Sequence, residues 1–113
     1  MSLKRVITEF GAGNDLHGGD YTKAALRAVE DAIHHSSLSL LRSLAIDAAR
    51  MQVAVTIGVQ RPEAVDEARV AAALPHGQVA VTVVKGGLDV PDETSGDRAV
   101  IASAAVAVRL DLA

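Results

Sequence analysis

Apolar and polar residues alternate along several short stretches of the chain, and this alternation is typical of β-strands. Met51–Val59 and Gln78–Lys85 both carry an apolar residue at every second position. Arg5–Phe10 is rich in β-branched residues, and Val100–Leu110 is apolar with small residues on both faces. The pattern therefore predicts four strands in these ranges.

Two other stretches repeat their apolar residues every three to four positions, as amphipathic helices do. The first runs from Tyr21 to about Ser36, and Asp20 before it is a favourable N-cap residue. The second begins at Arg61–Pro62 and continues to Leu74, because proline is favoured in the first turn of a helix. These stretches predict two helices.

The remaining stretches carry weaker patterns. Ser36–Asp47 fits either an extension of the first helix or a connector that packs on the core. Leu88–Arg98 is polar and is interpreted as an exposed loop. No repeat or linker divides the chain, so residues 1–113 are expected to form one domain.

The predicted order of elements is β-α-β-α-β-β. Strands joined by a helix run parallel, whereas the last two strands should run antiparallel. The expected fold is an α+β two-layer sandwich, with a mixed four-stranded sheet and both helices on one face. Because the other face of the sheet would stay uncovered and apolar, we expect a homo-oligomer, with a ring-like trimer favoured.

Net charge, cysteine content and the length of apolar runs exclude several classes of partner and of chemistry. The 113 residues carry a net charge of −3, which argues against nucleic acid and anionic membranes as partners. The chain has no cysteine, so disulfides and thiolate chemistry are excluded. It shows neither an apolar run of 18 residues nor the apolar region of a signal peptide, and a cytoplasmic protein is expected.

A glycine-rich stretch, Gly11–Asp20, separates the first predicted strand from the first helix and is interpreted as a loop. Such a junction is where α/β units place ligands, since helix amide groups point outward there. The stretch lacks a nucleotide motif, because a dinucleotide fingerprint needs glycine where Leu16 stands. Glycines at positions 11, 13 and 18 would let the backbone approach a ligand closely.

Asp15 and His17 supply the chemistry of this stretch. A carboxylate and an imidazole two residues apart could act as a general acid and base, or as two ligands of a divalent metal ion. The alternative is that Asp15 accepts hydrogen bonds from amides of its own loop while His17 is merely exposed. Lys23 or Arg27 would hold a small anionic molecule under the first interpretation.

Three segments carry a resemblance. The pattern G-x-G-x-D-x-H-G from Gly11 to Gly18, then D-x-T-K-A-A from Asp20 and A-I-H-H-S-S from Ala32, resembles a small family of uncharacterised conserved proteins over essentially the whole chain. The resemblance adds His34 and His35 to the candidate ligand-binding residues. Their alternative role is to favour the helix C-terminus through their charge or dipole.

The expected topology is also similar to the fold shared by the trimeric Bacillus-type chorismate mutase and methylerythritol cyclodiphosphate synthase. In the synthase a D-x-H after the first strand supplies two zinc ligands, and a histidine of the next helix supplies a third. Here that third position holds Arg27, whose guanidinium is a cation and binds no zinc. With arginine at this position, the resemblance implies that Arg27 binds an anion.

Three functions therefore remain open from the sequence. The first is an enzyme of small metabolites, with Asp15 and His17 in a site between subunits. The second is a non-catalytic homo-oligomer that binds a ligand or a metal. The third is a structural or interaction protein in which Asp15 serves only its own loop.

Overall fold

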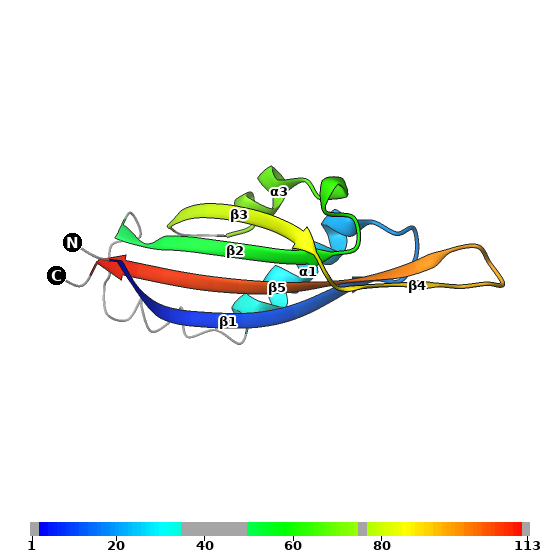
Figure 1. Cartoon of the computed structure of the whole chain (residues 1–113), viewed down its shortest axis with the longest axis horizontal. Helices are drawn as coiled ribbons and strands as arrows, with labels where there is room; N and C mark the ends of the chain where they lie inside the picture. The colour runs from blue at the N-terminus through cyan, green and yellow to red at the C-terminus, as the bar shows by residue number, and fades with distance from the viewer. Residues whose placement is uncertain (1–2, 35–49, 75–76, 112–113) are drawn as a thin grey trace.

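Five strands form one mixed sheet in the computed structural model, which describes residues 3–34, 50–74 and 77–111 (Figure 1). The strands are β1 (Leu3–Asp15), β2 (Gln52–Val59), β3 (Gln78–Lys85), β4 (Leu88–Pro91) and β5 (Arg98–Asp111). The helices of the described residues are α1 (Tyr21–His34), α3 (Glu67–Ala72) and a 3₁₀ turn, η2 (Pro62–Ala64). The ambiguous Ser36–Asp47 and the candidate His35 lie outside the described residues.

The sheet order is β1-β5-β2-β3, and β4 pairs with the beginning of β5. β2 and β3 pair in parallel, while β5 lies antiparallel to both β1 and β2. All helix-linked strands thus run in one direction, and the last strand runs against them. These directions and the α+β two-layer architecture confirm the predicted fold.

The core lies between the sheet and α1, which crosses behind β1 and β5 in Figure 1. Alternate residues of β2 and β5 point into it, so the period-two pattern of the sequence becomes one buried face. From α1 it receives mainly alanines, because Ala24, Ala28 and Ala32 recur every four residues and have no exposed surface.

Strand β1 is longer than expected, because Gly11–Asp15 continues it and does not begin a loop. Gly11 and Gly13 lie directly under α1. A Cβ atom at Gly11 would stand 2.4 Å from the Ala28 carbonyl oxygen, and one at Gly13 would stand 2.3 Å from the Ala28 nitrogen. Neither glycine has a positive φ angle. The structure therefore gives these two glycines a packing role, that of letting helix and strand approach closely.

The second predicted helix is broken into two pieces. η2 follows the end of β2, and α3 starts anew at Asp66, whose side chain accepts a hydrogen bond from the Arg69 backbone nitrogen. The prediction of one continuous helix from Arg61 was wrong, because Asp66 caps a new first turn and ends the run before it.

The sheet has a fifth strand where the sequence indicated only a loop. β4 and the start of β5 form a hairpin, closed by a hydrogen bond from the Asp92 backbone nitrogen to the Asp97 carbonyl oxygen and one from the Gly96 nitrogen to the Asp92 carbonyl oxygen. The hairpin projects beyond the sheet as an arm, and the molecule measures 57 Å along its longest axis (Figure 1). The prediction of a four-stranded sheet was wrong, because β4 of this arm adds a fifth strand.

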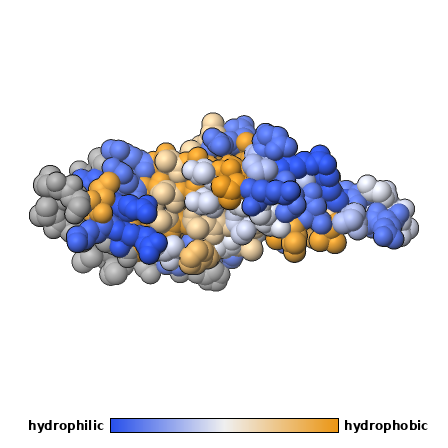
Figure 2. Space-filling view, viewed as in Figure 1, coloured by the Kyte–Doolittle hydropathy of each residue, from blue (hydrophilic) through white to orange (hydrophobic). Residues whose placement is uncertain are grey.

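The face of the sheet opposite α1 carries no helix of the described residues, and we call it the open face. Residues paired directly across strands share a face, so the register assigns its members. Most are small or apolar, and between hydrophilic ends the centre of this side is pale to orange in Figure 2. They are Leu3, Thr8, Phe10, Ala12, Ala54, Thr56, Gly58, Ala80, Thr82, Val84, Leu88, Val90, Ala99, Ile101, Ser103, Ala105 and Ala107.

None of the described helices is both long and apolar enough to cross a membrane.

Candidate functional site

Asp15 ends β1, and only 4% of its surface is exposed. Its Oδ2 accepts a hydrogen bond of 3.0 Å from the Asp20 backbone nitrogen. Its Oδ1 lies 3.6 Å from Lys23 Nζ and 3.8 Å from an Arg27 guanidinium nitrogen. The carboxylate is therefore occupied by its own loop and by two cations of α1, as the structural alternative expects.

His17 points away from this arrangement. Its side chain is 88% exposed, and its Nδ1 lies 3.3 Å from an Asp97 carboxylate oxygen on the hairpin. The other oxygen of Asp97 accepts a hydrogen bond from the Gly18 backbone nitrogen. Asp15 and His17 share no partner among the described contacts. The structure thus places them in two separate interactions.

Asp97 ties the β1–α1 loop to the base of the arm. Its pKa is lowered, chiefly because the backbone N–H groups of Gly18 and Arg98 donate to its carboxylate, with a smaller contribution from His17. The charged form is therefore the one that holds the loop in place.

A second polar group lies beside this loop. Tyr21, only 4% exposed, donates a hydrogen bond from its hydroxyl to Asp89 Oδ2. The Arg98 guanidinium lies 5.5 Å from the Tyr21 ring centre and 4.0 Å from the same Asp89 oxygen. Burial, followed by the hydrogen bond to Asp89, raises the pKa of Tyr21. Asp89 Oδ1 is buried and has no hydrogen-bond partner among the described residues.

The other predicted ligand-binding residues are spread over α1. Arg27 donates a 2.7 Å hydrogen bond to the Asn14 carbonyl oxygen, and Asp31, one turn later, accepts one from the Ala12 nitrogen. These two side chains cover the free edge of β1, where unpaired backbone groups would otherwise invite another strand. Arg27 thus has a structural role at the edge of β1, in addition to the anion-binding role predicted from the sequence.

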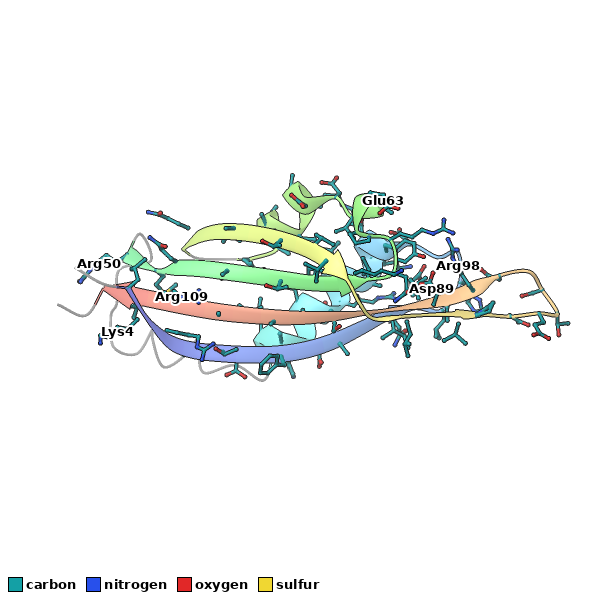
Figure 3. All side chains as sticks on the ribbon, viewed as in Figure 1. Lys4, Arg50, Glu63, Asp89, Arg98 and Arg109 are labelled. Atoms are coloured by element: carbon teal, nitrogen blue, oxygen red, sulfur yellow. The ribbon has the colours of Figure 1, made fainter. Side chains whose placement is uncertain are left out.

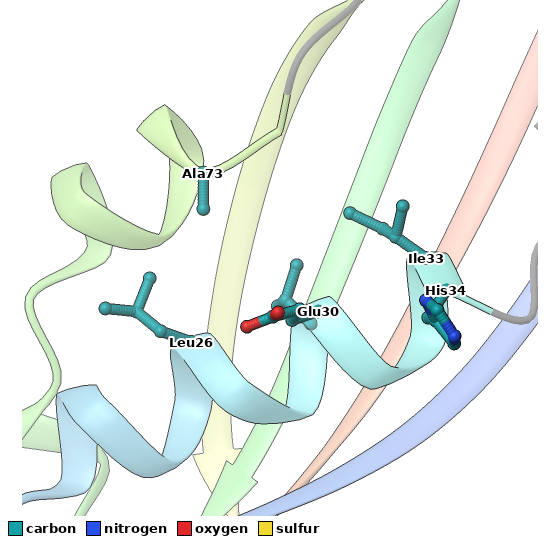
Figure 4. Close-up of a pocket in the computed structure, with 6 residues that line it drawn as sticks. Leu26, Glu30, Ile33, His34 and Ala73 are labelled. Carbon is teal, nitrogen blue, oxygen red and sulfur yellow. The ribbon is translucent and has the colours of Figure 1, made fainter.

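His34 lies far along α1 from the loop. With Leu26, Glu30, Ile33 and neighbouring side chains it lines a groove of about 420 Å³ between α1 and α3, shown in Figure 4. The groove is separate from the Asp15 loop, so the structure does not bring His34 together with the other candidates.

The described residues contain no group of three or more His, Cys, Asp or Glu side chains arranged to hold a metal ion. At Asp15, Lys23 and Arg27 already occupy the space where a cation would approach. The negative charge of Asp15 is thus balanced by cations of its own chain, and the metal-binding role of Asp15 and His17 stays a prediction.

Replacing Asp15 with asparagine should lower the free energy of unfolding by about 1–3 kcal/mol, since a buried carboxylate with three partners loses its charge. His17→Ala is the matched control, and its exposed side chain should change stability by less than about 0.5 kcal/mol. Denaturant unfolding of both variants, with and without divalent metal, makes the comparison. Unchanged stability of Asp15→Asn, with loss of a metal-induced stabilisation seen in the wild type, would instead support the metal site.

Sequence reasoning missed Tyr21, Asp89, Asp97 and Arg98. A signal for Asp89 was present, because the alternation Leu88-Asp89-Val90 places it on the face opposite its two apolar neighbours. It was overlooked since the whole stretch was interpreted as a loop.

Comparisons with known proteins give a family and a solved relative. The family model of a conserved hypothetical protein, Lin0512_fam, matches residues 5–108, which confirms the resemblance to an uncharacterised conserved family. A crystal structure of an FtsZ-like protein of unknown function from Nostoc punctiforme is 38% identical, with a TM-score of 0.85, and the match covers 98% of each chain. No curated protein matches this chain.

Proposed function

The chain belongs to the Lin0512 family of conserved hypothetical proteins, and we propose that it functions as a homo-oligomer whose copies pair through the open face. One observation carries the proposal. The sheet buries one face against α1 and α3, while its other face leaves Phe10 of the edge strand β1 72% exposed. A sheet with an apolar second face is stable when another layer covers that face.

The exposed apolar side chains support this proposal by their distribution. Six large hydrophobic residues of the described chain are exposed, and five of them belong to the open face: Leu3, Phe10, Val84, Leu88 and Val90. Burying a side chain of this size contributes about 1.5–3 kcal/mol when the burial is complete. A second copy paired through the open face would cover these side chains.

The open face also carries many small side chains, which would let another sheet approach it closely. Cross-strand rows such as Thr8–Ala107–Ala54–Ala80 contain only small side chains. Sheets that pack face to face lie about 10 Å apart, and small residues permit that approach over a wide area. Phe10, in the next row beside Ala105, would then provide the large contact that anchors the pair.

Pairing through one shared surface is isologous and closes at two copies. The assembly proposed is therefore a dimer, whereas the sequence favoured a ring-like trimer. The mass in solution decides between them.

The enzyme hypothesis requires Asp15 and His17 to reach a common ligand. In the structure each of them is held by different partners, and the Asp15 carboxylate serves its own loop and α1. This geometry favours an interaction protein over a metabolite enzyme at this loop. Catalysis by the two residues stays a prediction.

Replacing Phe10 with serine tests the proposal. The variant should keep its fold, because the ring is exposed within one chain, but should dissociate at concentrations at which the wild type is paired. Leu16→Ser removes another exposed apolar side chain, 61% exposed but outside the strands, and should leave the assembly intact. Light scattering gives both masses, and an unchanged mass for Phe10→Ser would refute the proposed interface.

A further inference from the structure

Two arginines face each other across the sheet at one end of the open face. Arg5 of β1 pairs directly with Arg109 of β5, and Gln52 follows in the same row. Like charges placed directly opposite each other on neighbouring strands repel. Neither arginine has an ion pair among the described residues. Figure 3 labels Arg109 at this end, with Lys4 and Arg50 nearby.

The other end of the molecule carries the opposite charge. The turn of the arm contains Asp92 and Glu93, which are both exposed. Asp92 accepts only local hydrogen bonds near the turn, such as that from the Thr94 nitrogen, and these keep its pKa low and its carboxylate charged. The acidic turn and the arginine pair thus lie at opposite ends of the longest axis (Figures 1 and 3).

Leu88 and Val90 place the arm itself on the open face, since they pair with Ile101 and Ala99 of β5. The arm is therefore a continuation of the apolar surface beyond the body of the sheet. A partner that covers this surface must meet the arm and, at its tip, the acidic turn.

We propose that two copies pair their open faces with antiparallel long axes, so that Asp92 and Glu93 of one copy lie against Arg5 and Arg109 of the other. The proposal rests on the proposed function, because it takes a second copy as the occupant of the open face. Two-fold symmetry makes this contact twice. In the parallel arrangement arginine pairs would meet arginine pairs, and acidic turns would meet acidic turns, so charge decides the direction.

Charge reversal at either end tests the direction. Arg5→Glu with Arg109→Glu, or Asp92→Lys with Glu93→Lys, creates two repulsive contacts in the antiparallel dimer and should raise its Kd about tenfold or more at low ionic strength. In a parallel dimer the same reversals would only exchange one repulsion for another. Sedimentation velocity over a range of concentrations measures the Kd.

The two reversals together supply a rescue. A chain that carries all four substitutions, and likewise a mixture of the two double variants, should regain a Kd close to that of the wild type. Glu30→Lys with Glu63→Lys is the matched control, because it changes the net charge as much as the turn variant does, at exposed residues of α1 and η2. This control should leave the Kd unchanged.

The outcomes separate the two proposals. A wild-type chain that remains monomeric overturns the proposed function, and the antiparallel arrangement with it. A wild-type dimer whose Kd neither double variant changes, or whose weakened double variants are not rescued by the fourfold substitution, overturns only the antiparallel arrangement.

Discussion

Replacing Gly13 with alanine should lower the free energy of unfolding by about 3 kcal/mol or prevent folding altogether. The added Cβ would stand 2.3 Å from the Ala28 nitrogen and 2.5 Å from the Ala24 carbonyl oxygen. Both are backbone atoms of α1, so no side-chain rotation relieves the contact. The helix must move away from β1, and its buried alanines then lose their contacts with the sheet.

Ala68→Ser is the control for this substitution. Ala68 is an exposed residue of α3 outside the open face, so a hydroxyl there should change stability by less than about 0.5 kcal/mol. Chemical denaturation of both variants measures the difference. If Gly13→Ala unfolded at the same denaturant concentration as the wild type, the close contact of α1 with β1 would be refuted.

Replacing Ala105 with arginine should abolish pairing without unfolding the chain. Ala105 lies in the middle of the open face, between Phe10 and Thr56 of the flanking strands. In one chain the new side chain extends into water. In the pair it would bury a guanidinium without a counterion, which costs several kcal/mol and should raise the Kd of the dimer by at least about a hundredfold.

Ala68→Arg provides the control for that variant, because it places the same new side chain at an exposed position of α3 on the other side of the molecule. Its mass should match that of the wild type. Equal masses for all three proteins at micromolar concentration, each twice that of a single chain, would show that the open face is not the interface.

The sequence predicted the elements whose pattern reports burial directly. Strand β2 alternates strictly, and α1 carries its apolar stripe behind a capping aspartate, so both were found almost to the residue. The directions of the strands followed from the helices that join them. These features depend on the local periodicity of apolar residues, which can be recognised in the sequence without knowledge of distant contacts.

The wrong predictions concern residues whose type is explained by a contact with an element that is distant in the sequence. Gly11 and Gly13 were interpreted as loop residues that meet a ligand, although they meet the backbone of α1. The sequence also carried the other side of this contact. Ala24, Ala28 and Ala32 are spaced to place small side chains on the helix face that lies against the glycines of β1. Neither the glycines nor the alanines indicate the contact when they are considered alone.

The candidate site shows the same limit. Asp15 was correctly singled out, and its alternative role within its own loop is the one that the contacts support. Its separation from His17 could not be foreseen, because the partner of His17, Asp97, lies 80 residues away on an arm that was not expected. Residues of the open face such as Phe10 were classified only by strand, since the pairing register fixes which side each one occupies.

Sedimentation equilibrium of the wild-type chain measures whether the open face binds a second copy. As concentration rises, the mass should increase from the 11.7 kDa of one chain to twice that value and no further. The Ala105→Arg variant, measured beside it, should stay at the mass of one chain. A wild-type mass of 11.7 kDa at every concentration, with the native fold intact, would contradict the claim that the open face binds a second copy.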